Sequence, residues 1–320
     1  MGFPEASYRL GLFLLAAIAL QNPARTQSAG SAKDAGPGMG PQSKGVITLA
    51  VAALDRKKNL VADLKLGDFT ILEDGEPQLI TSFKLEDLPV SICVLVDDSG
   101  SMRSKREDAA QMAMELLTAS NPLDEFLVVK FNDEAHLDQD FTNELSRIQS
   151  GLRKGLARGG TSLYDSMLAA SDHLVDGAKH PKKALVIISD GDDNESRAKS
   201  PAVLRDFQGL NRPVVYAIGL LKGEPTRSLG RVRHVLEDLS AETGGAAFFP
   251  RSLGDMHRTA LRIAAEIRNQ YSISYESSAP GGPDQYRKLT IAVRQKDLVI
   301  HARPGYFAEV ASPSKKSRVR

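Results

Sequence analysis

The sequence predicts an α/β protein in which a doubly wound, mainly parallel sheet is accompanied by a small β-domain built from both chain ends. Three observations predict this fold class. Apolar strand patterns alternate with helical patterns between Val90 and about Gln270, strand patterns alone occur on either side, and 320 residues are enough for a sizeable core. Strands that are apolar throughout are typical of a parallel sheet covered by helices on both faces.

The central region supplies the strands and helices of the doubly wound sheet. Apolar runs bounded by turn signals predict strands at 90–96, 126–131, 184–189, 213–220 and 245–249. Apolar residues at helical spacing predict helices around 109–117, 163–174, 232–239 and 260–267. The polar, alternating run HLDQDF (136–141) is typical of an edge strand.

The regions before and after this one contain only strand patterns. Residues 46–54 and 69–85 precede it, and Asp74-Gly75 predicts a hairpin turn within the second run. Three further runs follow it, at 271–277, 286–294 and 298–308. The economical arrangement pairs the first and last strands in one small β-domain, with the α/β region inserted between them.

The N-terminus has the composition of an export signal. Arg9 precedes the apolar stretch 10–20, and Pro23 with small polar residues follows. This stretch is too short for a membrane span of roughly 20 residues, so none is expected in the mature chain; a buried N-terminal helix is the alternative. The expected organisation is signal peptide 1–28, flexible linker 29–44, N-terminal β-strands 45–88, α/β domain 89–270, C-terminal β-strands 271–308 and basic tail 309–320.

Charge and cysteine content narrow the partners and the compartment. A formal net charge of +1 disfavours nucleic acid as a partner bound by bulk electrostatics, and the absence of Trp disfavours a base-stacking surface. Cys93, the only cysteine, lies inside an apolar run and is interpreted as a small buried hydrophobe. Export without an internal disulfide favours a bacterial envelope protein, periplasmic or secreted.

Carboxylates and hydroxyls collect where predicted strands end. Asp97 follows one apolar run and is succeeded by Ser99 and Ser101, while Asp190 follows another. Thr161 comes directly after two glycines, at the start of a predicted helix. Since ligands of open α/β sheets bind beyond the carboxyl ends of the strands, we expect these side chains to share one edge. An oxygen-only set of this kind suits a hard divalent cation such as Mg²⁺.

The proportion of hydroxyls indicates how such a site would act. Hydroxyls are neutral ligands, so a cation held by Ser and Thr keeps much of its charge and attracts an acidic group from a partner. By contrast, Asp165 in the run SLYDS is expected to accept hydrogen bonds from loop amides rather than to bind metal.

Together these residues resemble the metal-ion-dependent adhesion site of von Willebrand factor type A (VWFA) domains, which have a Rossmann-like fold. The resemblance implies that Ser99, Ser101 and Thr161 bind one Mg²⁺ or Mn²⁺ ion through their hydroxyls. It implies that Asp97 and Asp190 bind the ion directly or through water. The flanking strands are also similar to a group of exported VWFA-related proteins that is abundant in acidobacterial genomes.

Three functions are compatible with these patterns. The favoured one is a non-enzymatic, metal-dependent module that binds a partner protein through an Asp or Glu carboxylate. The second is a structural envelope protein with a purely structural metal. The third is a Mg²⁺-dependent phosphoryl hydrolase using Asp97 as nucleophile. It is disfavoured because Ser99 stands where such enzymes place a second Asp, and because no Ser–His–Asp arrangement or P-loop is apparent.

Overall fold

The computed structural model of the protein describes residues 45–85, 87–155, 157–191, 193–223, 226–277 and 285–307, which belong to one compact unit, Ser43–Arg320. The expected signal peptide (1–28), linker (29–44) and basic tail (309–320) lie outside the described residues and stay predictions. No helix among the described residues is long and apolar enough to cross a membrane.

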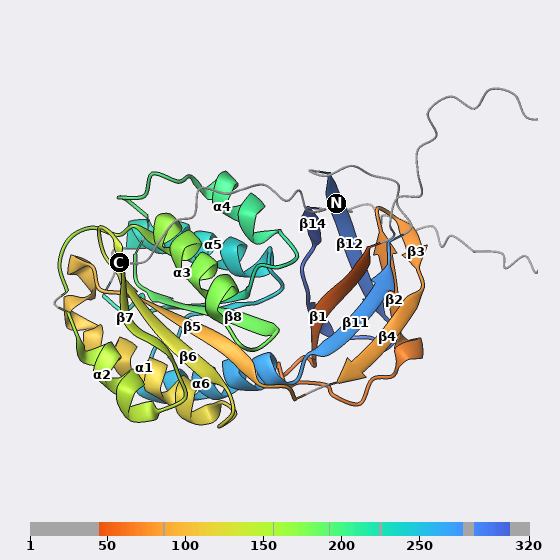
Figure 1. Cartoon of the computed structure of the whole chain (residues 1–320), viewed down its shortest axis with the longest axis horizontal. Coiled ribbons are helices and arrows are strands. Elements are labelled where there is room, and N and C mark those ends of the chain that lie inside the picture. The colour runs from red at the N-terminus through yellow and green to blue at the C-terminus, as the bar shows by residue number, and fades with distance from the viewer. Residues whose placement is uncertain are drawn as a thin grey trace, which may run out of the picture. The chain divides into compact units, whose positions relative to one another are not determined.

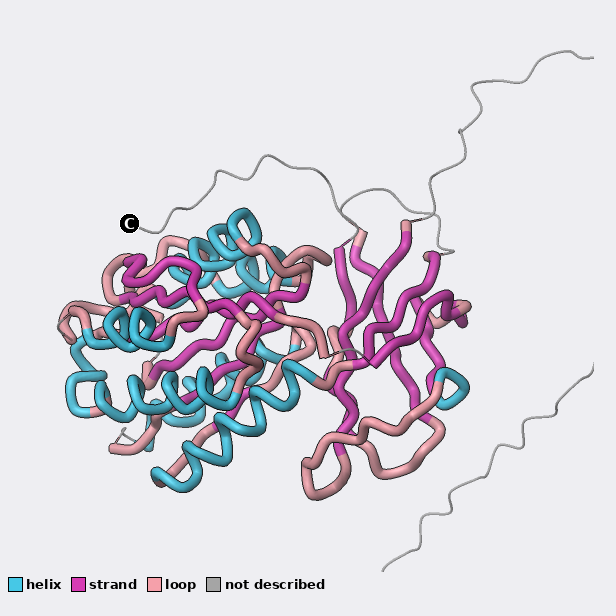
Figure 2. The backbone as a smooth tube through the Cα atoms, turned by 60° about the horizontal axis from the view of Figure 1, so that its bottom comes forward, coloured by secondary structure: helices cyan, strands magenta, loops and turns pink. Residues whose placement is uncertain are grey.

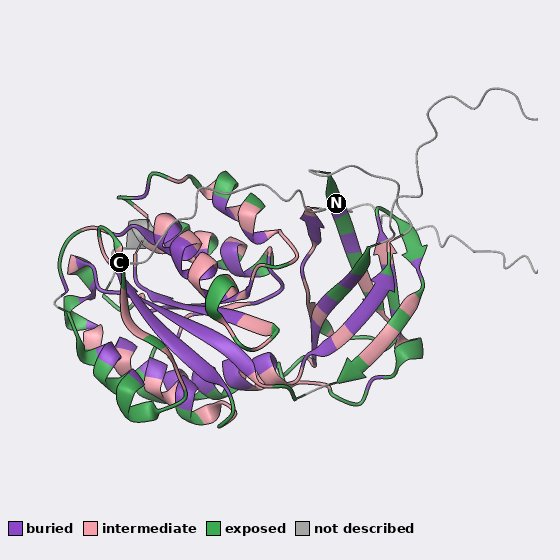
Figure 3. Ribbon diagram, viewed as in Figure 1, coloured by how far each residue is buried: buried purple, intermediate pink, exposed green. Residues whose placement is uncertain are grey.

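The centre of the α/β domain is a six-stranded sheet with the strand order β10-β9-β8-β5-β6-β7 (Figure 1). Neighbouring strands are parallel except for the edge strand β7, which runs antiparallel to β6. The central strand β5 is buried along its full length (Figure 3). The strands are β5 (Val90–Asp97), β6 (Glu125–Phe131), β7 (Ala135–Thr142), β8 (Lys182–Ser189), β9 (Val214–Gly219) and β10 (Ala247–Phe248).

Alternate side chains of the sheet point into two separate cores, as strand geometry requires. Ile92 and Val94 of β5 pack in one core with α1 (Arg106–Ala119), α2 (Leu145–Arg153) and α6 (Leu253–Arg268). Cys93 and Leu95 pack in the other core with α3 (Leu163–Gly177), α4 (Ser200–Phe207) and α5 (Thr226–Ala241). Figure 1 shows these helices in two layers, one on each face of the sheet.

The β-domain consists of two four-stranded sheets that enclose a third core. One sheet has the order β13-β1-β11-β4 and the other β14-β12-β2-β3. Figure 2 shows that this domain contains strands and loops with one short helix, η1 (Leu66–Asp68). Its strands are β1 (Val46–Leu54), β2 (Phe69–Glu73), β3 (Glu76–Gln78), β4 (Ile80–Leu85), β11 (Tyr271–Glu276), β12 (Tyr286–Val293), β13 (Val299–His301) and β14 (Gly305–Phe307).

Strands from the two ends of the chain pair directly with each other. β11 lies between β1 and β4 and is antiparallel to both, and β12 is antiparallel to β2. Tyr271 and Ile273 of β11 share the third core with Leu49 of β1 and Phe69 of β2. The predicted fold class is therefore confirmed: a doubly wound, mainly parallel sheet accompanied by a β-domain made from both chain ends.

The predicted hairpin at Asp74-Gly75 is present and joins β2 to β3. Both turn residues have positive φ, 51° at Asp74 and 91° at Gly75. Asp and Gly tolerate this backbone better than most residues, which is why the pair marks a tight hairpin. The Asp74 carboxylate also accepts a hydrogen bond from the Lys288 amide at 2.8 Å, so the turn is attached to β12.

The structure differs from the prediction at three elements. The helices α2 and α4 were not predicted, since each is short and offers few apolar repeats. The run 298–308 was expected to form one strand but forms β13 and β14, which belong to different sheets. Pro304 lies between them, and a residue without a backbone N–H interrupts a strand ladder.

Candidate functional site

The acid at the end of β5 is held by its neighbours in the chain and in the sheet. Asp97 is the last residue of β5 and is 2% exposed. The Ser99 amide donates to Asp97 Oδ1 at 2.9 Å, and the Ser189 hydroxyl donates to Oδ2 at 2.6 Å. Because β5 and β8 are parallel, with Val96 opposite Ile188, Ser189 lies beside Asp97. Two neighbouring strand ends therefore fix this carboxylate.

The two serines after Asp97 connect it to the second acid. Ser99 precedes the short 3₁₀-helix η2 (Gly100–Ser104), which contains Ser101. The hydroxyl oxygens of Ser99 and Ser101 lie 3.1 Å apart, and the Ser101 hydroxyl donates to Asp190 Oδ1 at 2.8 Å. Asp190 directly follows β8 and is 1% exposed. The hydroxyls thus form a hydrogen-bonded path that ends on Asp190.

Thr161 reaches the same edge of the sheet from the loop before α3. The Gly100 amide donates to the carbonyl oxygen of Gly159 at 3.1 Å, which joins this loop to the segment that contains Ser99 and Ser101. A Cβ atom added to Gly191 would lie 3.5 Å from Thr161 Oγ1 and 3.7 Å from Asp97 Oδ2. The two oxygens therefore both lie close to the backbone that follows Asp190, on the side where a Gly191 side chain would be.

The structure brings together all five residues predicted to bind metal. They are called the acid–hydroxyl cluster below and are Asp97, Ser99, Ser101, Thr161 and Asp190. Four of the five side chains are buried, whereas Ser101 is exposed. Solvent, or a group from a partner, therefore has access to the cluster from the side of Ser101.

Lys105 is a buried member of this site that sequence reasoning missed. Its ammonium nitrogen lies 2.5 Å from Asp190 Oδ2, and the side chains of Lys105 and Asp190 are 9% and 0% exposed. Lys105 follows η2 and precedes α1, in the run SMRSKRED. Arg103 and Arg106 lie in the same run, so no local signal distinguishes the basic residue whose side chain points inward.

Asp98, the acid directly after Asp97, lies outside the cluster and faces Arg106, with 3.6 Å between Asp98 Oδ1 and Arg106 Nε.

Asp165 supports the loop behind the cluster, as predicted. Its two carboxylate oxygens accept hydrogen bonds from the amides of Arg197 and Ala198, both at 2.9 Å. The same loop contains Asn194, whose side-chain oxygen accepts from the Thr161 amide at 2.8 Å. The expectation that Asp165 binds loop amides is confirmed, and the loop in turn positions Thr161.

The two carboxylates of the cluster have different electrostatic surroundings. Burial raises the pKa of Asp97 to about 6, and the hydrogen bonds from Ser189 and Ser99 limit the rise. Asp190 has a cation at hydrogen-bonding distance, whereas the groups that contact Asp97 are neutral donors. Of these two acids, Asp97 is consequently the one whose negative charge the surrounding residues compensate less.

The donor set is chemically suited to a hard divalent cation. Three hydroxyl and two carboxylate side chains offer oxygen ligands only, and Mg²⁺ and Mn²⁺ accept such ligands. A typical zinc site would instead offer His nitrogen and Cys sulfur ligands. No group of three or more His, Cys, Asp or Glu side chains that could hold a metal ion occurs within the described residues. A cation at this edge would therefore depend on the hydroxyls. The ammonium of Lys105, already beside Asp190, shows that the cluster accommodates positive charge.

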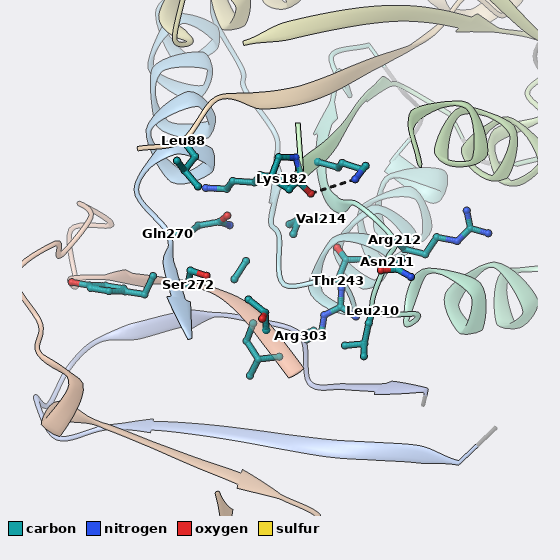
Figure 4. A pocket seen from close by; sticks show the side chains of 16 residues that line it. Leu88, Lys182, Leu210, Asn211, Arg212, Val214, Thr243, Gln270, Ser272 and Arg303 are labelled. Atoms are coloured by element: carbon teal, nitrogen blue, oxygen red, sulfur yellow. Dashed lines mark hydrogen bonds between the residues drawn. The ribbon is translucent and has the colours of Figure 1, made fainter. Parts of the chain in front are cut away.

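A separate pocket of ≈ 320 Å³ lies apart from the acid–hydroxyl cluster and shares no residue with it (Figure 4). Residues of both domains line it, among them Ser272 of β11 and Val214 of β9. Each cationic side chain in its lining already donates a hydrogen bond within the protein; these are Lys182, Lys183, Arg212 and Arg303. We assign the pocket no function.

Comparison with known proteins identifies the α/β domain. Residues 92–192 match the family model of the von Willebrand factor type A domain. No curated protein matches the sequence.

Several solved structures are similar to this chain. A von Willebrand factor type A protein from Catenulispora acidiphila is 14% identical, with 86% of this chain and 76% of that chain covered and a TM-score of 0.46. BatB, a conserved hypothetical protein from Bacteroides thetaiotaomicron, is 13% identical (55% and 98% covered, TM-score 0.44). The vWF domain of the type V pili tip protein Mfa5 from Porphyromonas gingivalis is also 13% identical (57% and 97% covered, TM-score 0.45). The match over residues 92–192 therefore shows a von Willebrand factor type A domain within the α/β region of this chain.

Proposed function

We propose that this protein is a metal-ion-dependent protein-binding module of the bacterial cell envelope, exported by its N-terminal segment. The observation that carries the proposal is the acid–hydroxyl cluster. Residues from three separate loops converge there at the carboxyl edge of the sheet. Hydrogen bonds connect Ser99, Ser101 and Asp190 through their side chains, and the Ser99 amide connects them to Asp97. Thr161 Oγ1 and Asp97 Oδ2 both lie close to Gly191, the residue after Asp190. The match to the von Willebrand factor type A family supports the same conclusion. The more specific resemblance to an exported bacterial group stays a prediction.

The proposed ligands of a single Mg²⁺ or Mn²⁺ ion are the hydroxyls of Ser99, Ser101 and Thr161, with Asp97 and Asp190 as direct or water-mediated partners. When bound, the ion would supply an electrophilic position for a carboxylate oxygen of the partner. Ser101 is the exposed member of the cluster, so we expect an Asp or Glu side chain of the partner to approach from its side.

The protein's own residues prepare this position. Ser189 and the Ser99 amide orient Asp97, and Asn194 orients Thr161. Ser99 and the 3₁₀-helix η2 that it precedes place the Ser99 and Ser101 hydroxyls in one short segment, and the Gly100 amide of this segment donates to the loop that contains Thr161. Such preorganisation lowers the ordering cost that ion and partner binding would otherwise incur.

Calorimetric titration with MnCl₂ and MgCl₂ tests the ion part of the proposal. The wild-type protein is compared with Asp97→Ala and Thr161→Ala, and with the matched controls Asp63→Ala and Thr70→Ala on exposed β-domain positions. We expect one ion per wild-type chain, unchanged uptake in both controls, and no uptake in either cluster variant. Identical uptake by the wild type and Asp97→Ala would show that the acid–hydroxyl cluster is not the metal site.

Selection of a random peptide library on the immobilised protein, with Mg²⁺ or with chelator, tests the binding part. We expect the Mg²⁺ condition alone to enrich peptides that share an Asp or Glu, whose replacement by Asn or Gln abolishes binding. A structural metal would give ion uptake without any Mg²⁺-dependent peptide. Turnover of a generic phosphate ester that is lost in Asp97→Ala would instead establish the hydrolase alternative.

A further inference from the structure

Both carboxylate oxygens of Asp190 already have a donor within the protein. Oδ1 accepts from the Ser101 hydroxyl at 2.8 Å, and Oδ2 lies 2.5 Å from the Lys105 ammonium. Asp190 is completely buried at its side chain, and Lys105 nearly so. A buried carboxylate without a partner is costly, so the ammonium provides the charge that makes a buried Asp190 tolerable.

Lys105 belongs to the same short segment as the proposed serine ligands. Its backbone is anchored on both sides: its amide donates to the Met102 carbonyl at 2.9 Å, and its carbonyl accepts from the Ala109 amide at 2.8 Å. Met102 is fully buried beneath the turn. With the backbone fixed in this way, the four-carbon stem of Lys105 is the part that can swing away from Asp190 without disturbing Ser101.

A divalent cation bound by Ser101 and Asp190 would lie close to the present position of the Lys105 ammonium. Two positive charges so close together repel strongly in a buried site, where solvent screening is weak. A lysine ammonium cannot accept a metal, because it has donors only. The two cations therefore cannot both occupy their preferred positions at Asp190.

Resting on the function proposed above, we propose that Lys105 is a tethered counter-cation that neutralises Asp190 in the metal-free protein and is displaced when a divalent cation binds. Metal loading is then an exchange of cations at Asp190. The exchange has two consequences: the loops stay ordered without metal, and metal affinity is lower than the oxygen ligands alone would give. Lys105 is a positioning and affinity-setting residue, distinct from the proposed ligands.

Manganese titration of Lys105→Met tests the exchange, because methionine keeps much of the stem and removes the charge. Lys105→Arg retains a cation, and Lys296→Met is the matched control at an exposed loop position. We expect Lys105→Met to bind Mn²⁺ about tenfold or more tightly than the wild type, since the competing charge is gone. Lys296→Met is expected to bind as the wild type does. In chelator, the unfolding temperature of Lys105→Met is expected to lie below that of the wild type. Adding Mn²⁺ should raise the unfolding temperature of Lys105→Met by more than it raises that of the wild type.

Each outcome of this titration is informative. Equal dissociation constants for the wild type and Lys105→Met would overturn the exchange and leave the proposed metal site intact. Binding by Lys105→Met alone would overturn the exchange, because Lys105 would then block the site and not be displaced by the ion. If neither protein takes up Mn²⁺ while folded, the proposed metal site fails, and the exchange with it.

Chemical labelling of the unmodified protein tests the displacement without relying on a variant that folds. Reductive methylation of lysines is followed by mass spectrometry of the peptide that contains Lys105. We expect Lys105 to react slowly in chelator, because it is buried and ion-paired, and severalfold faster in saturating Mg²⁺. The exposed Lys296 should react at the same rate in both. Protection of Lys105 that is unchanged by saturating Mg²⁺ would overturn the displacement.

Discussion

The Ser189 hydroxyl donates a hydrogen bond to Asp97 Oδ2 over 2.6 Å, linking the ends of two neighbouring parallel strands that are 92 residues apart in sequence. The same serine oxygen accepts from the Gly191 amide at 3.1 Å. Ser189 therefore ties the acid of one strand to the loop that carries the other acid. The relative position of the two carboxylates follows from the parallel register of β5 and β8.

The buried Asp97 predicts a pH-dependent stability of the metal-free protein. Its pKa of about 6 in the folded state lies above the value near 4 expected when unfolded, so the folded state binds this proton more tightly. The stabilisation that protonation provides is present below about pH 4 and is lost as the pH rises through about 6. Between about pH 4 and above pH 6, the free energy of unfolding of the wild-type protein in chelator should fall by at most about 3 kcal/mol relative to that of Asp97→Asn.

Urea unfolding at several pH values between 4 and 7.5, always in chelator, measures this difference. Comparing the two proteins at each pH cancels the contributions of all other titrating groups. Ser189→Ala should move the window to higher pH, because it removes a hydrogen bond that favours the charged form. A difference between wild type and Asp97→Asn that does not change with pH would contradict the assignment.

Asp165→Ala is expected to destabilise the loop that positions Thr161. The change leaves the amides of Arg197 and Ala198 without their acceptor, at a cost of about 1–2 kcal/mol in the free energy of unfolding. Asp165→Asn keeps one acceptor oxygen and should lose less unfolding free energy than Asp165→Ala. Denaturant unfolding measures both variants, and a loss in Asp165→Ala indistinguishable from zero would mean that water replaces the carboxylate.

Arg212 is expected to stabilise the α/β domain by joining two acids. Its guanidinium lies 2.6 Å from Asp172 of α3 and 2.7 Å from Asp206 of α4, and in Figure 4 its side chain extends away from the other labelled residues. Arg212→Met leaves two largely buried carboxylates without their cationic partner, which should lower the free energy of unfolding by about 3 kcal/mol. Adding Asp172→Asn and Asp206→Asn to that variant should recover part of the loss. No recovery would indicate that the arginine stem, through packing, makes the main contribution.

Cys93 is expected to be unreactive in the folded protein. It is fully buried between β5 and α3, and burial raises the pKa of its thiol above the ordinary range. Labelling with iodoacetamide should therefore proceed only through global unfolding, at a rate that increases with urea in parallel with the unfolding rate. Rapid labelling without denaturant would show that the second core opens locally.

How far the site could be predicted depends on how local each signal is. The five oxygen-bearing residues could be named because each follows a strand or opens a helix, and parallel strands place their carboxyl ends at one edge. Their role as metal ligands stays a prediction. Lys105 could not be named: the residue it contacts is 85 positions away, and its long stem can point in many directions. Its inward direction is seen only in the folded protein, where the ammonium contacts Asp190.

The sequence by itself determined the alternation of strands and helices, the strand-only regions at both chain ends, and the positions of the acids and hydroxyls. These follow from hydrophobic periodicity and turn residues, which act over a few neighbours. The pairing of the two chain ends in one β-domain could be predicted only as the economical arrangement, because it joins strands more than 200 residues apart. Tertiary structure alone decided that 298–308 divides between two sheets, that α2 and α4 form, and that Asp190 pairs with Lys105. In each case the deciding energy comes from burial against residues distant in sequence. A short helix or a buried charge is stable only once that surface exists.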